Sequence, residues 1–318
     1  HVRSRRQRQM CIRDSFIPSP SQGVWYLGPI PLRAYALAIL LGIFLACLWA
    51  SRRYKARGGD PELIVDLAIW VVPIGIIGAR IYHVLSKWQD YFGPTGDPKE
   101  IPLIWHGGLA IWGGVIAGTI TACLVLRHRQ LKIAPVADAI APAILVGQIF
   151  GRLGNYFNQE LFGRPTTLPW GLQIDLQHRP LGFEQYATFH PTFLYEMLWN
   201  LAAIGALLWI ERHFRPRGGM MMGFYLCAYS LGRFWVENLR MDQANQFLGL
   251  RVNAWTSLLM FILGLALALW CYRQNFPRRQ ESNPQKDRKN FPEVPDNSVS
   301  YSSSSERETT SALESGKN

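Results

Sequence analysis

The chain has 318 residues, of which 49% are hydrophobic, and its formal net charge is +11. Its long apolar runs all lie between about residue 30 and residue 272, and a membrane-spanning helix needs about 20 mostly apolar residues. This pattern excludes a large soluble domain. The basic excess lies in the loops between the apolar runs, so it indicates membrane topology and we expect no nucleic-acid partner.

A polar leader comes first, over residues 1–23. Its initial stretch, HVRSRRQRQMCIRDS at residues 1–15, holds five arginines and lacks the apolar core of a signal peptide. We expect this stretch to be foreign to the native chain, which would then start near Phe16.

Seven apolar segments follow and predict an all-α polytopic membrane protein, with one seven-span domain over residues 24–272. Residues 85–104 and 155–190 are the two connections long enough for small arm and head segments. The predicted spans are residues 31–50, 61–84, 105–126, 136–154, 191–210, 219–239 and 253–272.

Lysine and arginine in the short loops predict the orientation. The sequences SRRYKARGG, RHRQLK, ERHFRPRGG and CYRQNFPRRQ follow the first, third, fifth and seventh spans, so all four lie on one side. Basic loops mark the cytoplasmic side, which places the N-terminus outside and the C-terminus inside. The tail, residues 273–318, is rich in Ser, Glu, Asn and Lys, and we expect it to be disordered and cytoplasmic.

Polar groups from six predicted spans share one depth, in the outer half of the bilayer. A charge buried in a membrane costs at least ~2.5 kcal/mol, so such groups usually face a cavity and pair with one another. The groups at this depth are Arg33, Tyr35, Arg80, His106, Arg152, Asn155, Asn158, Glu160, His190, Tyr195, Glu196, Arg233, Glu237 and Arg240.

Three of these groups, Arg80, Arg152 and Arg233, are cations with few acids around them. A guanidinium group is a planar fork that suits phosphate oxygens. The residues alone therefore predict a cavity that opens to the outer leaflet and binds an anionic ligand bearing phosphate, such as a phospholipid headgroup.

Each of these residues also has a structural interpretation. Arg233 and Glu237 are four residues apart on one helix and could satisfy each other, and Tyr195 and Glu196 could simply bind backbone. Arg33 could extend along the membrane surface. The convergence of so many groups at one depth favours a binding cavity over these separate explanations.

Common catalytic and metal-binding motifs are missing from the sequence. There is no GxSxG, HExxH, P-loop or Cys/His metal spacing, and we expect neither a metal nor a cofactor. His106 and His190 are the proton acceptors nearest neutral pH, and His106 is favoured because glycines follow it directly.

The stretch GRLGNYFNQELFG, residues 151–163, resembles the signature G-R-x-G-N-F-x-N-x-E-x-x-G of bacterial prolipoprotein diacylglyceryl transferases. Tyr156 stands where the signature has Phe, which keeps an aromatic ring. The resemblance covers about residues 24–272. Further matching pieces follow in the same order along the chain: GPIPLRAY, GARIYHVL, WHGGLAIWGG, HPTFLYE and GRFWVENLRMD.

The resemblance implies a seven-span protein of the bacterial inner membrane whose site faces the outer side. It implies transfer of the diacylglyceryl group from phosphatidylglycerol to the lipobox cysteine thiol of a prolipoprotein signal peptide. Glycerol 1-phosphate leaves, and this is the first step of lipoprotein maturation. Phosphatidylglycerol, prolipoproteins and membrane lipids are the implied partners, and no cofactor is implied.

The family's functional positions fall on residues from four of the predicted spans and their outer ends. We expect His106, Arg152 and Arg233 to be catalytic, and Arg80 joins the binding residues because of its depth and charge. The expected substrate-binding residues are Tyr35, Arg80, Asn155, Glu160, Gly163, Tyr229 and Glu237.

The roles expected from the resemblance are physical. Arg152 and Arg233 would hold the phosphate and stabilise the charge that grows as the C–O bond breaks. His106 would take the thiol proton, or a phosphate oxygen would take it instead. Asn155 and Glu160 would orient Arg152 or the glycerol hydroxyls.

The remaining expected roles are supporting ones. Glu237 would fix the guanidinium group of Arg233. Tyr35 and Tyr229 would bind the headgroup, and Gly163 would allow a tight turn or a close approach of lipid.

A transporter or flippase for anionic phospholipids is the alternative function. It would also need cations at one leaflet, but its polar path would continue to the inner side, where Asp66 and Asp138 are acidic. A structural or receptor-like seven-span protein would not need three arginines at one depth.

Overall fold

The computed structural model describes residues 16–28, 30–242 and 246–281. The chain divides into two compact units, residues 1–276 and 277–318, and the fold below is that of the first. The predictions for residues 1–15 and for the tail beyond residue 281 lie outside the described residues.

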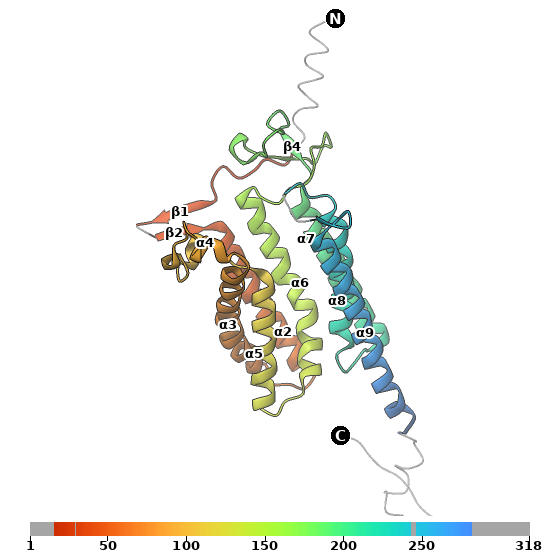
Figure 1. Ribbon diagram of the computed structural model, residues 1–318. Coiled ribbons are helices and arrows are strands. Elements are labelled where there is room, and N and C mark those ends of the chain that lie inside the picture. Colours follow the sequence, from red (N-terminus) through yellow and green to blue (C-terminus); the bar gives the residue numbers. More distant parts are fainter. Residues whose placement is uncertain (1–15, 29, 243–245, 282–318) are drawn as a thin grey trace, which may run out of the picture. The chain divides into compact units, whose positions relative to one another are not determined.

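Seven long helices overlap the seven predicted spans (Figure 1). Six of them are long and apolar enough to cross a membrane, and α8, which carries Arg233 and Glu237, is not among those six described helices. The seven helices are α2 (Ala34–Lys55), α3 (Glu62–Ser86), α5 (Ile111–His128), α6 (Ile133–Asn158), α7 (Thr192–Phe214), α8 (Met220–Glu237) and α9 (Val252–Glu281).

Helix α5 begins six residues later than the predicted span 105–126. Gly107 and Gly108 have φ values of 98° and 75°, in a region that favours glycine and that an α-helix does not use. The chain therefore forms a short 3-10 turn, η2 (Ile104–His106), and starts the helix only at Ile111. The difference takes His106 out of the helix and places it in a connecting loop.

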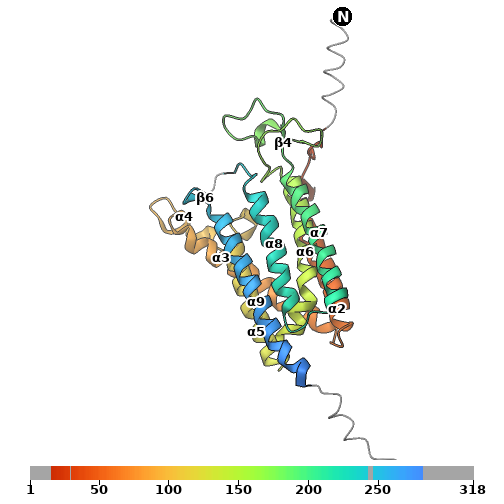
Figure 2. The ribbon, with the colours of Figure 1, turned by 90° about the vertical axis from the view of Figure 1, so that its right-hand side faces the viewer.

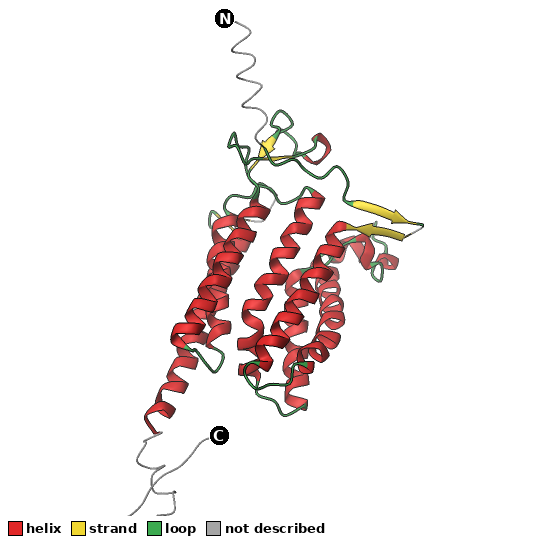
Figure 3. Cartoon of the chain, turned by 180° about the vertical axis from the view of Figure 1, so that it is seen from behind, coloured by secondary structure: helices red, strands yellow, loops and turns green. Residues whose placement is uncertain are grey.

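Short elements gather at one end of the bundle, which we call the head end (Figure 3). The described residues also form three antiparallel two-stranded sheets. The protein is therefore mostly helical and not all-α as the sequence predicted. The short elements are β1 (Val24–Leu27), β2 (Ile30–Arg33), α4 (Trp88–Phe92), η1 (Pro98–Glu100), β3 (Leu172–Gln173), η3 (Leu176–His178), β4 (Thr188–Phe189), β5 (Gln246–Phe247) and β6 (Leu250–Arg251).

Glycines let the long helices approach closely, as small residues do in membrane bundles. A side chain at Gly113 of α5 would overlap the carbonyl oxygen of Gly78 in α3. A side chain at Gly223 of α8 would meet the backbone of α9 at Gly264.

Helix α6 lies at the centre, packed against α2 on one side and against α7 and α8 on the other (Figures 1 and 2). Its last residues turn into the head through Gln159 and Leu161, whose φ values of 51° and 59° are left-handed. The side chain of Gln159 binds both the backbone N–H and the carboxylate of Asp175, which ties the head segment to the helix end. The ends of α6, the start of α7 and the end of α8 thus meet at the head end.

Candidate functional site

Two arginines from different helices bind one carboxylate at the head end. Glu196, in the first turns of α7, forms an ion pair through Oε2 with Arg152 Nε of α6. Its Oε1 accepts a hydrogen bond from Arg233 Nη1 of α8 at 2.7 Å. Glu196 is 5% exposed, so this is a buried bridge between three helices. The two arginines that the sequence predicted to act together are therefore held together.

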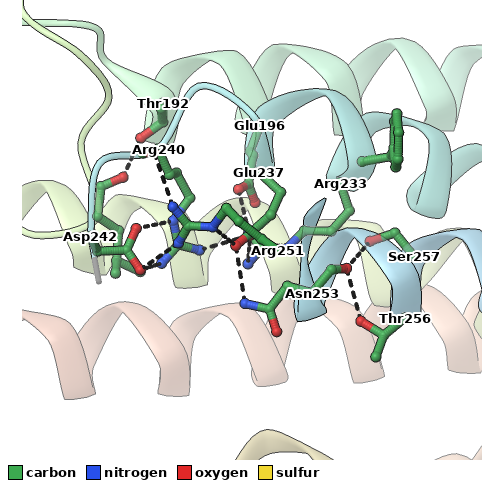
Figure 4. Close-up of polar contacts among 12 residues, drawn as sticks. Thr192, Glu196, Arg233, Glu237, Arg240, Asp242, Arg251, Asn253, Thr256 and Ser257 are labelled. Carbon is green, nitrogen blue, oxygen red and sulfur yellow. Dashed lines mark hydrogen bonds and ion pairs between the residues drawn. The ribbon is translucent and has the colours of Figure 1, made fainter. Parts of the chain in front are cut away.

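Glu237 is the centre of a second set of contacts, the Glu237 cluster, made of Arg233, Glu237, Arg240, Asp242, Arg251 and Asn253 (Figure 4). Its Oε2 lies 2.7 Å from Arg233 Nη2 and 3.4 Å from Arg240 Nη1. Its Oε1 lies 2.8 Å from Arg251 Nε and 3.1 Å from Asn253 Nδ2. A carboxylate with 0% exposure is costly to bury, and these four donors offset that cost.

Asp242 joins Arg240 to Arg251 beyond the end of α8. Arg240 binds both of its carboxylate oxygens, at 2.7 and 2.9 Å, and Arg251 Nη2 binds Oδ2 at 2.9 Å. Burial alone would raise the pKa of Asp242, but the hydrogen bond and charge of Arg240 and the charge of Arg251 outweigh it and hold the pKa below its ordinary value. The loop after α8 is therefore fixed by charge onto the start of α9.

The end of α6 adds amide groups to the site. Arg152 Nη1 donates to Asn155 Oδ1 at 3.0 Å, and Asn155 Nδ2 donates to Glu160 Oε1 at 2.8 Å. Asn158 Nδ2 donates to the same oxygen at 3.1 Å. A small hollow is lined by Arg152, Asn155, Glu160, Leu161, Thr192, Phe193 and Glu196. The signature stretch thus supplies one wall of this hollow and the start of α7 supplies the other.

Gly163 is packed where no side chain fits. A β-carbon there would lie 2.8 Å from His190 Cβ and 3.0 Å from Leu239 O, and its N–H donates to His190 O at 2.9 Å. The positive φ values in this stretch are at Gln159 and Leu161, so the tight turn predicted at Gly163 is not left-handed at Gly163 itself. The close approach at Gly163 is that of the chain's own backbone.

Two tyrosines flank the arginines. Tyr35, in the first turn of α2, lies close enough to Glu160 and Arg152 to interact with both charges. A side chain at Gly154 would overlap its ring, so α6 leaves room for Tyr35. Tyr229 interacts electrostatically with Arg233, one turn along α8. Both predicted binding tyrosines therefore lie beside a predicted catalytic arginine.

His106 lies apart from these contacts in the described chain. Its side chain is 54% exposed, and its Nδ1 lies 2.8 Å from Glu100 Oε2. A carboxylate only accepts hydrogen bonds, so Nδ1 donates and Nε2 is left to accept a proton. The structure does not bring His106 into contact with Arg152 or Arg233, and its role as proton acceptor stays a prediction.

Arg80 binds the loop that carries His106. Its guanidinium group donates to the carbonyl oxygens of Ile101 at 2.8 Å, Gly107 at 2.6 Å and Gly108 at 2.9 Å, and also to that of Glu100. Every nitrogen of this group is thus committed to backbone, and the side chain is buried. These contacts favour a loop-holding role for Arg80, and its predicted role in substrate binding stays a prediction.

The charges of the site nearly balance. Four guanidinium groups face Glu196, Glu237 and Asp242, and Glu160 lies beside them on amide donors. In the described part of the chain, Arg152 Nη2 and Arg233 Nε have no hydrogen-bond or ion-pair partner. An anion that binds here would find these two donors unoccupied, and it must compete with carboxylates for the others.

Sequence reasoning missed part of this arrangement. Glu196 was placed at the right depth but interpreted as a possible backbone contact, although it stands in the matching piece HPTFLYE. Asp242 and Arg251 are absent from the predicted site. No local spacing connects Arg251 to Glu237, because the chain returns to the site only when α9 packs against α8.

Comparisons of the sequence with known proteins point to one family. A family model described as prolipoprotein diacylglyceryl transferase matches residues 22–270. The chain is 49% identical over 252 residues to phosphatidylglycerol–prolipoprotein diacylglyceryl transferase 2 of Streptomyces coelicolor, with 79% of this chain and 80% of the relative covered. It is 48% identical over 263 residues to the phosphatidylglycerol–prolipoprotein diacylglyceryl transferase of Corynebacterium efficiens, covering 80% and 82% of the two chains. The corresponding protein of Rhodococcus jostii is 47% identical over 263 residues, covering 79% and 73%.

Proposed function

Since the chain belongs to the prolipoprotein diacylglyceryl transferase family, we propose that it transfers the diacylglyceryl group of phosphatidylglycerol to the lipobox cysteine of a prolipoprotein. One observation supports this function most strongly: Arg152 and Arg233, on separate helices, meet at Glu196 beside a hollow that the family signature lines.

The proposed step exchanges one bond for another. The cysteine sulfur forms a bond to the diacylglyceryl carbon that carries the phosphate, and the C–O bond between that carbon and the phosphate breaks. Glycerol 1-phosphate leaves, and its phosphate changes from a singly charged diester to a monoester with more negative charge. Guanidinium groups that bind this phosphate stabilise the transition state more than the ground state. Arg152 and Arg233 are the groups to which we assign this role.

The thiol must lose its proton, because the thiolate is the competent nucleophile. We assign the proton to His106 Nε2, since Glu100 holds Nδ1 and thereby fixes the tautomer. A phosphate oxygen bound by the arginines is the alternative acceptor. Arg80 would act on this step only indirectly, by holding the loop that carries His106.

The membrane placement follows from the charges. The end opposite the head carries the basic residues of the last turns of α2, α5 and α7, which indicates the cytoplasmic side. We therefore propose that the head end faces the outer side of the bacterial inner membrane and that α8 also crosses it, as the sixth of seven spans. Its buried ion pairs would offset the cost of its two charges there.

The contacts at the cytoplasmic end do not favour a flippase. Asp138 accepts hydrogen bonds from the backbone N–H groups of Gly219 and Met221, both at 2.9 Å, and so caps α8. Asp66 is paired with Arg129 at 2.8 Å. Both acids have structural partners and add no cationic path for a phosphate.

Product formation tests the proposal. Purified protein is incubated with phosphatidylglycerol and a lipobox peptide, and glycerol phosphate and the thioether-linked peptide are measured together. A transferase forms the two products in equal amounts. Lipid movement between leaflets without either product would instead establish the transporter function. Complementation of a transferase-depleted cell, scored by prolipoprotein maturation, provides the same test in vivo.

A further inference from the structure

We propose that Glu196 is a positioning residue for the transfer reaction: it holds Arg152 and Arg233 in one orientation and competes with the lipid phosphate for their N–H groups. This inference rests on the proposed function of the site. It concerns a residue outside the set that the sequence assigned to catalysis or binding.

Among the described carboxylates, Glu196 is the one that contacts both Arg152 and Arg233. Each of its oxygens contacts one of the two arginines, Oε2 with Arg152 Nε and Oε1 with Arg233 Nη1 at 2.7 Å. Two guanidinium groups this close to one carboxylate would repel each other without its charge. Glu196 therefore permits the two cations to lie near each other.

The orientation of each arginine is then fixed by a second contact. Arg152 is also bound by Asn155, at 3.0 Å, and Arg233 by Glu237, at 2.7 Å. With Glu196, each guanidinium group has two anchors, which leaves Arg152 Nη2 and Arg233 Nε without a partner in the described chain. Those donors are the ones that we expect a phosphate to reach first.

The charge of Glu196 has a second consequence. A carboxylate that holds these N–H groups weakens the binding of a singly charged phosphodiester, and it also weakens the binding of the glycerol phosphate product. The phosphate in the transition state carries more charge and competes better. Glu196 thus weakens the binding of the phosphodiester substrate relative to the transition state. It also weakens the binding of the glycerol phosphate product, and both effects favour turnover.

The other end of the same helix offers a matched control. Glu211, in the last turn of α7, also bridges two arginines, Arg53 at 2.9 Å and Arg57. It lies far along α7 from the hollow and contacts none of the residues assigned to the site. Glu196→Gln and Glu211→Gln therefore remove the same charge from the same kind of bridge.

The experiment measures kcat, KM for phosphatidylglycerol and the inhibition constant of glycerol 1-phosphate for the wild type, Glu196→Gln, Glu196→Asp and Glu211→Gln. Titration calorimetry with glycerol 1-phosphate adds a readout that does not need activity. For Glu196→Gln we expect kcat to fall at least tenfold while KM and the inhibition constant fall about threefold or more. Glu196→Asp, which keeps the charge, should regain part of kcat, and Glu211→Gln should match the wild type.

The possible results separate the two proposals. If the wild type forms no product, the proposed function fails, and calorimetry alone then decides whether Glu196→Gln binds the anion more tightly. If the wild type is active but Glu196→Gln shows unchanged or weaker binding of glycerol 1-phosphate, the positioning proposal is overturned. Equal effects in Glu196→Gln and Glu211→Gln would overturn it as well, since both would then reflect a loss of helix packing.

Discussion

The two ends of α7 carry the same arrangement of charges and differ in their surroundings. At each end a glutamate bridges two arginines, Glu196 at the head end and Glu211 at the opposite end. The side chain of Glu196 is 6% exposed and lines a hollow, whereas that of Glu211 is 28% exposed. Its partner Arg53 also donates to Ala139 O of α6, so the Glu211 bridge fastens helices together. Burial and the neighbouring hollow, and not the bridged arginines alone, are therefore the reasons for which we propose the site at the head end.

The largest effect is expected at Arg233. Arg233→Lys keeps the charge but removes the planar guanidinium group whose two Nη atoms contact Glu196 and Glu237. The transfer rate should therefore fall about 100-fold or more. The rate of glycerol phosphate release measures it. Arg57→Lys is the matched change at the opposite end and should stay within about threefold of the wild type. Equal losses in the two variants would remove the distinction between the ends.

The next largest effect is expected on the free energy of unfolding, because Glu237 is fully buried. Glu237→Ala removes a carboxylate with 0% exposure and leaves three arginines without it, which should lower the free energy of unfolding by about 3–5 kcal/mol. Glu211→Ala should cost about 1 kcal/mol or less, because its bridge is partly exposed. Unfolding curves of both variants in one detergent provide the measurement. A Glu211→Ala variant as unstable as Glu237→Ala would contradict this ranking.

Two glycines at the end of α6 test the packing of the signature stretch. Gly163→Ala forces a β-carbon against His190 and Leu239 and should destabilise the protein by about 1–3 kcal/mol. Gly151, in the same stretch, faces open space inside α6, so Gly151→Ala should be neutral or stabilise by about 0.5–1 kcal/mol. Thermal unfolding of both variants checks the opposite signs. The packing argument fails if Gly163→Ala melts at the wild-type temperature.

The smallest effect concerns pH. The pKa of Asp242 is lower in the folded chain than its ordinary value of about 3.9, so its ion pairs stabilise the fold fully above that value. This contribution is lost as the pH falls through the lowered pKa. Asp242→Asn should therefore unfold at a slightly lower temperature than the wild type at pH 7, and the difference should shrink below about pH 4. A difference that grows on acidification would have the wrong sign.

Much of the fold was predictable because it depends on apolar length. All seven predicted spans overlap helices. The largest error at a helix start is in the third span, which was predicted to begin six residues too early, because the φ values of Gly107 and Gly108 are incompatible with a helix there. This late helix start depends on the backbone angles of two glycines and does not change the pattern of apolar residues. The apolar pattern could therefore not predict it. The three small sheets at the head end have strands of two to four residues, too short for alternation to show.

The site was predictable where neighbours in sequence are also partners, and less so elsewhere. Arg152, Asn155 and Glu160 lie within one stretch, and Arg233 and Glu237 lie one helical turn apart. The predicted depth in the membrane grouped Arg80 with these residues, but depth does not tell which way a side chain points. The guanidinium group of Arg80 donates to backbone carbonyl oxygens instead. Arg251 reaches Glu237 only through the packing of α9, which no sequence spacing records.

The most direct test of the account compares Arg152→Lys with Arg53→Lys. Each changes one arginine of a glutamate bridge on α7, at opposite ends. Release of glycerol 1-phosphate from phosphatidylglycerol, measured with a lipobox peptide present, should fall about 100-fold or more in Arg152→Lys and stay within about threefold of the wild type in Arg53→Lys. Full activity in Arg152→Lys, or an equal loss in both variants, would contradict the claim that the head end of α7 is the site of transfer.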